Sequence, residues 1–213
     1  MSEHPHTPLL TCEGLACIRQ GRRLFSQLGV SVLEGGVLLV RGRNGSGKST
    51  LLRCFAGLME SEGRVGRSAN FLYLGHKDAV KMESTVADNL RFWAEINGET
   101  MLLSAAIDYF GLEPFLDVPC HMLSAGWRKR VALARLLTHP APLWLLDEPY
   151  THLDEEAVRL LGGLVETRVR KKGAVVMAVH HLPPEALGEV RHVSVLNVED
   201  FCVPVREDVF YAA

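Results

Sequence analysis

Short runs of consecutive apolar residues recur along the chain, and a polar or glycine-rich segment follows each of them. The runs are Val37–Val40, Phe71–Leu74, Leu143–Leu146 and Ala174–Val179. Runs of this length between turn residues are typical of strands that are buried on both faces of a parallel sheet. The pattern therefore predicts an α/β fold with a central, mostly parallel sheet.

Apolar residues at helical spacing follow the first run. Leu51, Leu52, Phe55 and Leu58 fall on one face of a helix that begins near Lys48. Before this run, residues 9 to 40 suit short strands, with a turn at Glu34–Gly36. We expect these strands to form a small N-terminal antiparallel β layer. Residues 57 to 66 are expected to be a short connection.

Helical patterns dominate from Ser84 to Leu137. Ser84 is a suitable N-cap for a helix that ends before Gly98, and a second helix ends at Gly111. The prolines of residues 139–142 are expected to end the last helix. The apolar faces of the first two helices contain Val86, Leu90, Trp93 and Ile96, and Leu102, Leu103, Ala106, Ile107 and Phe110. We expect residues of about 77–137 to form a helical subdomain inserted into a single domain of residues 1–213.

A further helix is predicted from Glu155 to Lys172. Asp154 can cap its start, Gly173 can terminate it, and the acidic start and basic end suit the helix dipole. Its apolar face contains Ala157, Val158, Leu161, Leu164 and Val165. Together with the strand that follows, this helix completes a β-α-β unit.

Composition narrows the class of protein further. The chain has 213 residues, 47% of them hydrophobic, and a formal net charge of −2. That charge gives no general attraction to nucleic acid, and the basic clusters at residues 128–130 and 168–172 are expected to be solvated helix faces. The five cysteines are scattered, which indicates reduced thiols in a cytosolic compartment. We expect neither a secretory leader nor a membrane span, so any membrane would be reached through another chain.

A glycine-rich loop follows the first buried run and precedes its helix. Gly42 to Ser49 fits the pattern G-x-x-x-x-G-K-S, which binds nucleotide phosphates through backbone N–H groups. Lys48 would bridge the β- and γ-phosphates, and the Ser49 hydroxyl would ligate Mg²⁺. The nucleotide-binding residues expected here are Gly42, Asn44, Gly45, Ser46, Gly47, Lys48, Ser49 and Thr50. The motif predicts a protein that binds ATP or GTP.

Polar residues end two other buried runs, at the sheet edge where open α/β sheets bind ligands. Asp147 and Glu148 follow one run, so that Asp147 would hold Mg²⁺ and Glu148 would activate the attacking water. An acidic turn without a catalytic role is the alternative. His180 and His181 follow the other run, and His180 is the better candidate to reach the γ-phosphate; a surface histidine pair is the alternative here.

Leu123-Ser124-Ala125-Gly126-Trp127 precedes a basic helical segment. The order of six segments along the chain resembles that of the nucleotide-binding subunits of ABC transporters. They are the phosphate loop, His76, this segment, the Asp147-Glu148-Pro149 strand end, the Thr151–Asp154 turn and His180. Several residues depart from that family's pattern. His76 stands where glutamine is usual, Ala125 and Trp127 replace glycine and glutamine, and Arg19 stands where an aromatic ring usually stacks on adenine. A guanidinium plane could still stack there.

The resemblance implies an ABC-type P-loop ATPase that uses ATP and Mg²⁺. It implies catalytic roles for Glu148 and His180, a homodimer that encloses two ATP molecules, and a location at the cytoplasmic face of the membrane through integral membrane subunits. Ser124, Ala125 and Gly126 would contact the ATP bound by the other copy, and Asp154 would lie in the turn beside it. His76 would act on the metal through water. Direct coordination would be poor, because Mg²⁺ prefers oxygen ligands.

A narrower resemblance covers Leu74–His76, Lys81, Thr85, Asp88–Leu90 and the segment from Asp147 to Thr151. It is to the haem exporter ATP-binding subunits of bacterial cytochrome c maturation, and it implies a haem exporter permease as partner. The alternative is the ATPase subunit of a different ABC exporter or importer. A soluble ABC ATPase acting on DNA or ribosomes would need a second cassette or a coiled-coil insertion, and a plain kinase or GTPase would lack the signature segment.

Overall fold

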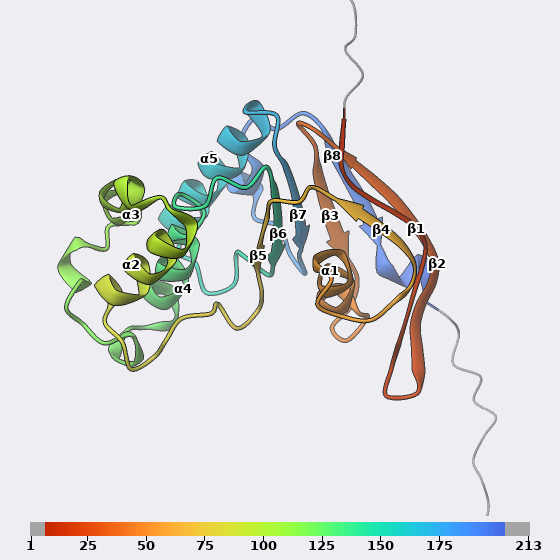
Figure 1. Cartoon of the computed structure of the whole chain (residues 1–213), viewed down its shortest axis with the longest axis horizontal. Helices are drawn as coiled ribbons and strands as arrows, with labels where there is room; N and C mark the ends of the chain where they lie inside the picture. Colours follow the sequence, from red (N-terminus) through yellow and green to blue (C-terminus); the bar gives the residue numbers. More distant parts are fainter. Residues whose placement is uncertain (1–6, 203–213) are drawn as a thin grey trace, which may run out of the picture.

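The computed structural model describes residues 7–202, so the expected domain of residues 1–213 extends beyond the described residues at both ends. Its centre is a five-stranded, wholly parallel sheet in the order β5-β6-β7-β3-β8 (Figure 1). The strands are β3 (Val37–Arg41), β5 (Phe71–Leu74), β6 (Leu143–Asp147), β7 (Ala174–Ala178) and β8 (Val193–Asn197). The four predicted buried runs are therefore strands of one parallel sheet, as the apolar pattern indicated.

The antiparallel layer has the order β2-β1-β4. Its strands are β1 (Pro8–Arg19), β2 (Arg22–Leu33) and β4 (Glu62–Arg67). The expectation of short strands was wrong, because β1 and β2 have 12 residues each and continue past several register shifts. The expectation of a plain connection over residues 57–66 was also wrong. β4 is almost wholly exposed, so no apolar pattern in the sequence predicts it. It is a strand because it pairs with β1.

The helices are α1 (Lys48–Ala56), α2 (Val86–Asn97), α3 (Leu103–Phe110), α4 (Ala125–Ala134) and α5 (Glu155–Arg170). Figure 1 shows α1 between the two sheets and α2, α3 and α4 grouped on the far side of the parallel sheet. Alternate strand residues divide between two cores. Leu38 and Leu145 pack with α1 and the antiparallel layer, whereas Leu39 and Leu146 pack with the helices of the other side.

Several helix boundaries differ from the predictions. Gly57 ends α1 with a φ of 70°, so Leu58 lies outside the helix and is 64% exposed. Thr85 caps α2 in place of Ser84, because its hydroxyl accepts a hydrogen bond from the backbone N–H of Asp88. Ile96 was assigned to the apolar face but is 60% exposed.

The ends of α4 and α5 also differ from expectation. α4 ends at Ala134, before the prolines that were expected to stop it. α5 ends at Arg170, and Lys172, rather than Gly173, adopts the positive φ that turns the chain. Within residues 7–202, we find no helix with the length and apolar character that crossing a membrane requires.

Candidate functional site

The glycine-rich loop joins β3 to α1 and leaves the start of α1 facing the cleft. The Lys48 ammonium donates to the carbonyl oxygens of Gly42 and Arg43, at 2.8 and 3.0 Å. Gly42 has a φ of 146°, and a Cβ placed there would lie 2.5 Å from the Ser46 hydroxyl oxygen. The loop therefore needs glycine at this position. Its N–H groups and the dipole of α1 suit a bound phosphate.

Ser49 at the start of α1 meets Asp147 at the end of β6. The Ser49 hydroxyl donates to Asp147 Oδ1 at 2.9 Å. Asp147 is 1% exposed, and its Oδ2 has no hydrogen-bond partner among residues 7–202. Burial, reinforced by the charge of Glu148, raises the pKa of Asp147 above its usual value. A buried carboxylate with a free oxygen beside a hydroxyl is a donor set that suits a hard cation such as Mg²⁺.

Glu148 lies immediately after β6, with a φ of 49° that non-glycine residues seldom adopt. Its Oε2 atom is 3.8 Å from the His76 Nδ1 atom and accepts a hydrogen bond of 3.5 Å from the Thr151 hydroxyl. Glu148 lines the cleft, whereas the buried Asp147 does not line it and meets it only through its hydrogen bond with Ser49. Backbone conformations of this kind concentrate at functional sites.

The cleft at the carboxyl edge of the parallel sheet has a volume of about 820 Å³. It brings together the predicted residues Arg19, Asn44, Gly45, Gly47, Lys48, Ser49, Thr50, His76, Glu148 and His180. Sequence reasoning missed Gln20, Arg22, Leu24 and Thr151, which also line the cleft. The signal that could have found the first three is their closeness in sequence to Arg19, because Gln20 lies in the turn after β1 and Arg22 and Leu24 lie at the start of β2.

The predicted signature residues lie at the start of α4 and do not line this cleft. The Ser124 hydroxyl accepts a hydrogen bond of 3.3 Å from the Trp127 N–H and so caps the helix. A Cβ at Gly126 would lie 2.9 Å from the carbonyl oxygen of His152. Only glycine therefore lets the signature segment approach the turn that precedes α5 this closely.

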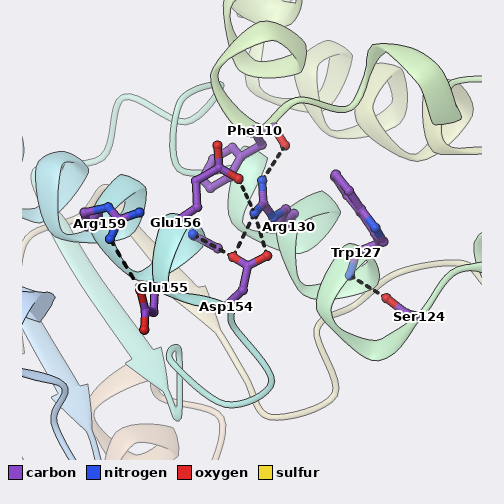
Figure 2. A network of polar contacts seen from close by, with 9 residues as sticks. Phe110, Ser124, Trp127, Arg130, Asp154, Glu155, Glu156 and Arg159 are labelled. Atoms are coloured by element: carbon purple, nitrogen blue, oxygen red, sulfur yellow. Dashed lines mark hydrogen bonds and ion pairs between the residues drawn. The ribbon is translucent and has the colours of Figure 1, made fainter.

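The expectation that residues 128–130 form a solvated face was wrong for two of them. Lys129 and Arg130 are each only 4% exposed. Figure 2 shows the Arg130 guanidinium against Asp154, with bonds of 2.8 and 2.9 Å, and against Glu156 at 2.7 Å. The periodic pattern could not reveal this, because the acidic partners come from the start of α5.

Asp154 has two roles in this network. Its carboxylate caps α5 by accepting from the Ala157 N–H at 2.8 Å and also receives Arg130. The Ala157 N–H and Arg130 together hold the pKa of Asp154 below its usual value. Asp154 thereby connects the turn beside Thr151 to α4. Asp154 itself does not line the cleft.

Comparison with known proteins agrees with this geometry. Residues 25–151 match the family described as "ABC transporter". A solved ATP-binding subunit of an ABC transporter has the same fold, with a TM-score of 0.73 and 24% identity over 81% of this chain and 79% of that one. Fold, site and match together define an ATPase of the ABC class.

Two curated relatives narrow the class. Both are described as "Cytochrome c biogenesis ATP-binding export protein CcmA". The protein of Paramagnetospirillum magneticum is 42% identical over 80% of this chain and 87% of its own length. The protein of Hahella chejuensis is 39% identical over 88% of this chain and 95% of its own length. The chain belongs to this family of ABC transporter ATP-binding proteins.

Proposed function

We propose that this chain is the ATP-hydrolysing subunit of a membrane exporter that serves cytochrome c biogenesis. The similarity to curated export proteins over most of the chain supports the biological role. The observation that carries the enzymatic role is the meeting of Ser49, Asp147, Glu148 and His76 at the mouth of one phosphate-binding loop. Residues 1–213 form a single nucleotide-binding domain in this proposal, with the helical subdomain of about 77–137 inserted in it.

Each cleft residue has a role that follows from its chemistry. Lys48 and the loop N–H groups bind the β- and γ-phosphates, and Arg19 stacks on the adenine. Ser49 and Asp147 hold Mg²⁺, whose charge offsets that of the phosphates when it is bound. The orphan Asp147 oxygen supports this assignment.

Glu148 is the proposed general base. Its carboxylate accepts a proton from a water molecule as the water oxygen bonds to the γ-phosphorus, and the bond from that phosphorus to the β-phosphate oxygen breaks. ADP and inorganic phosphate are the products. His76 orients Glu148 and acts on the metal shell through water, and His180 contacts the γ-phosphate.

The same proposal needs a second copy of the chain. Ser124, Ala125 and Gly126 lie outside the cleft of their own chain, and we assign them to the ATP bound by the partner copy. Asp154 holds the adjoining turn against α4 and so fixes the relative placement of these groups. Integral membrane subunits of the haem exporter permease type bind the dimer to the cytoplasmic face of the membrane, and haem is the proposed cargo or the group released from a chaperone complex.

Genetic complementation tests this function. Deleting the coding sequence should abolish c-type cytochromes, measured by haem staining of membrane proteins, and the wild-type chain should restore them. Lys48→Ala, expressed at the same level, should not restore them. Normal c-type cytochrome levels in the deletion strain would overturn the biological role and favour the alternative, the ATPase subunit of a different ABC transporter. Absence of ATP hydrolysis by the purified complex would overturn the enzymatic role.

A further inference from the structure

Buried polar atoms without hydrogen-bond partners gather at the amino end of β6, away from the nucleotide cleft. Nine buried side-chain polar atoms in residues 7–202 have no hydrogen-bond partner, and five of them belong to Arg135, His139, Trp144 and Arg168. The Arg168 guanidinium carbon lies 4.4 Å from the centre of the Trp144 ring. The charges of both arginines act on His139, which lies between α4 and β6. These side chains therefore form one cluster.

The positive charge of this cluster has no counter-ion in the described chain. Neither Arg135 nor Arg168 forms an ion pair with any carboxylate of residues 7–202. Arg135 is 7% exposed and stacks 3.5 Å over the Trp93 ring. Burial lowers the pKa of Arg135 to about 10 and lowers that of Arg168 as well. Buried cations are ordinarily paired, but no carboxylate of the described chain offsets the charge of Arg135 or of the partly buried Arg168. An anion beside Arg168 would offset it.

A cavity of about 350 Å³ adjoins the cluster. Trp144 and Arg168 line it, and Lys171 lies at its exposed rim. Most of the remaining wall is apolar and includes Leu102, Ala105, Leu136, Leu137 and Leu164. This volume lies within the range of about 300–1,000 Å³ that is usual for small-molecule sites.

The cavity is separate from the nucleotide site. Trp144 lies near the start of β6, whereas Asp147 ends that strand at the opposite edge of the sheet. The carboxyl-terminal part of α5, with Leu164 and Arg168, covers the cavity, whereas the start of that helix carries Asp154. Neither Trp144 nor Arg168 lines the nucleotide cleft.

We propose that this cavity binds a small organic monocarboxylate. The carboxylate lies against the Arg168 guanidinium beside the Trp144 ring, and Lys171 at the rim adds positive charge. Arg135 does not line the cavity and contributes only through its charge. Its apolar body fills the space between the leucines at positions 102, 136, 137 and 164. Inorganic phosphate fits the charges but leaves this apolar wall without a partner, so the wall selects an organic anion.

Calorimetry with the full chain tests the proposal, with acetate, hexanoate, octanoate and benzoate as probes. We expect saturable binding of at least one of the longer acids at low millimolar concentration or tighter, weaker binding of acetate, and no binding of the matched amide. Trp144 fluorescence should change on saturation. Absence of binding by all four acids up to about 20 mM, roughly tenfold above a millimolar dissociation constant, would overturn the proposal. Equal binding of an acid and its amide would also overturn it.

Substitutions test the assigned contacts. Arg168→Gln should weaken binding about tenfold or more, because it removes a charged hydrogen-bond donor. Arg170→Gln, on the same helix but exposed, should bind like the wild type. Unchanged ATP affinity shows that each variant is folded. An Arg168→Gln variant that keeps both ATP and carboxylate affinity would contradict the site.

Discussion

The Lys129 ammonium nitrogen lies 2.7 Å from the Asp78 carboxylate and joins α4 to the segment that follows His76. The Lys129 side chain is 4% exposed, and Asp78 is its one ion-pair partner within residues 7–202. Asp78 and the next residue, Ala79, both have a positive φ, so the chain turns sharply at this contact. The contact therefore connects the chain just after His76 to the helix that carries the proposed signature residues.

This ion pair should be important for stability. Asp78→Asn leaves a buried ammonium without a countercharge, and we expect the free energy of unfolding to fall by about 3 kcal/mol. Urea unfolding followed by circular dichroism measures the change. Asp117→Asn is the matched control, because Asp117 is exposed, and it should change stability by less than about 0.5 kcal/mol. If Asp78→Asn lost no more stability than Asp117→Asn, the Lys129–Asp78 ion pair would not contribute to stability.

Two cleft variants should separate catalysis from binding. Glu148→Gln keeps the size of the side chain but removes its basic oxygen, so ATP hydrolysis by the assembled transporter should fall about a hundredfold or more. ATP affinity, measured by equilibrium dialysis, should persist. Lys48→Ala should lose ATP affinity itself, because it removes a phosphate ligand. Near-full turnover in Glu148→Gln would remove the proposed base.

We propose that the segment from Lys77 to Glu95, which directly follows His76, is the docking surface for the membrane subunit. Val80 packs against the core on the helical side, so a charge there would also destabilise the chain. Met82 is 39% exposed and is the better probe. We expect Met82→Asp to abolish c-type cytochrome formation in cells and co-purification with the membrane subunit, while ATP binding by the isolated chain is retained.

Met101→Asp provides the control for this surface, because Met101 is 94% exposed and lies outside the segment. It should leave cytochrome formation intact. Normal cytochrome levels in the Met82→Asp strain, with the protein expressed, would place the docking surface elsewhere.

The buried cysteines predict that the stability of the fold decreases at high pH. All five are free; burial raises the pKa of Cys12 to about 11 and, reinforced by the neighbouring Cys17, that of Cys54 to about 12. The folded chain thus binds these protons more tightly than the unfolded chain, whose thiols titrate near 9.0. Their contribution to stability is complete below that pH and declines as the pH rises toward 11. Urea unfolding should show this decline between pH 8 and 10.5, and it should be smaller in Cys54→Ala.

The parallel sheet and the cleft could be predicted because their residues obey local rules. A buried strand needs an uninterrupted apolar run, and the phosphate loop needs glycines and a lysine at fixed spacing, so both are written in contiguous sequence. Asp147 and His180 were expected at one sheet edge for the same reason. Their roles as catalytic or metal-binding residues remain predictions.

The elements that were missed depend on partners far away in the chain. β4 and much of β8 are exposed and polar or mixed, and they are strands because β1 and β3 offer free edges. The burial of Arg130 likewise depends on Asp154 and Glu156 in the following β-α-β unit. A local sequence pattern contains no information on such distant pairing, and it therefore predicts a solvated surface for a basic cluster of which two residues are buried.

The position of β8 bears on how the molecule is made. β3 carries the phosphate loop near the beginning of the chain, yet one of its two neighbours is β8, and Glu199 just beyond β8 holds Arg43 in the loop at 2.7 Å. During synthesis the loop leaves the ribosome long before these supports exist. A nascent chain that ends before residue 193 has β3 at an open sheet edge and a loop without its anchor. Competence to bind ATP should therefore arise only after β8 and Glu199 have been synthesised and β8 has paired with β3.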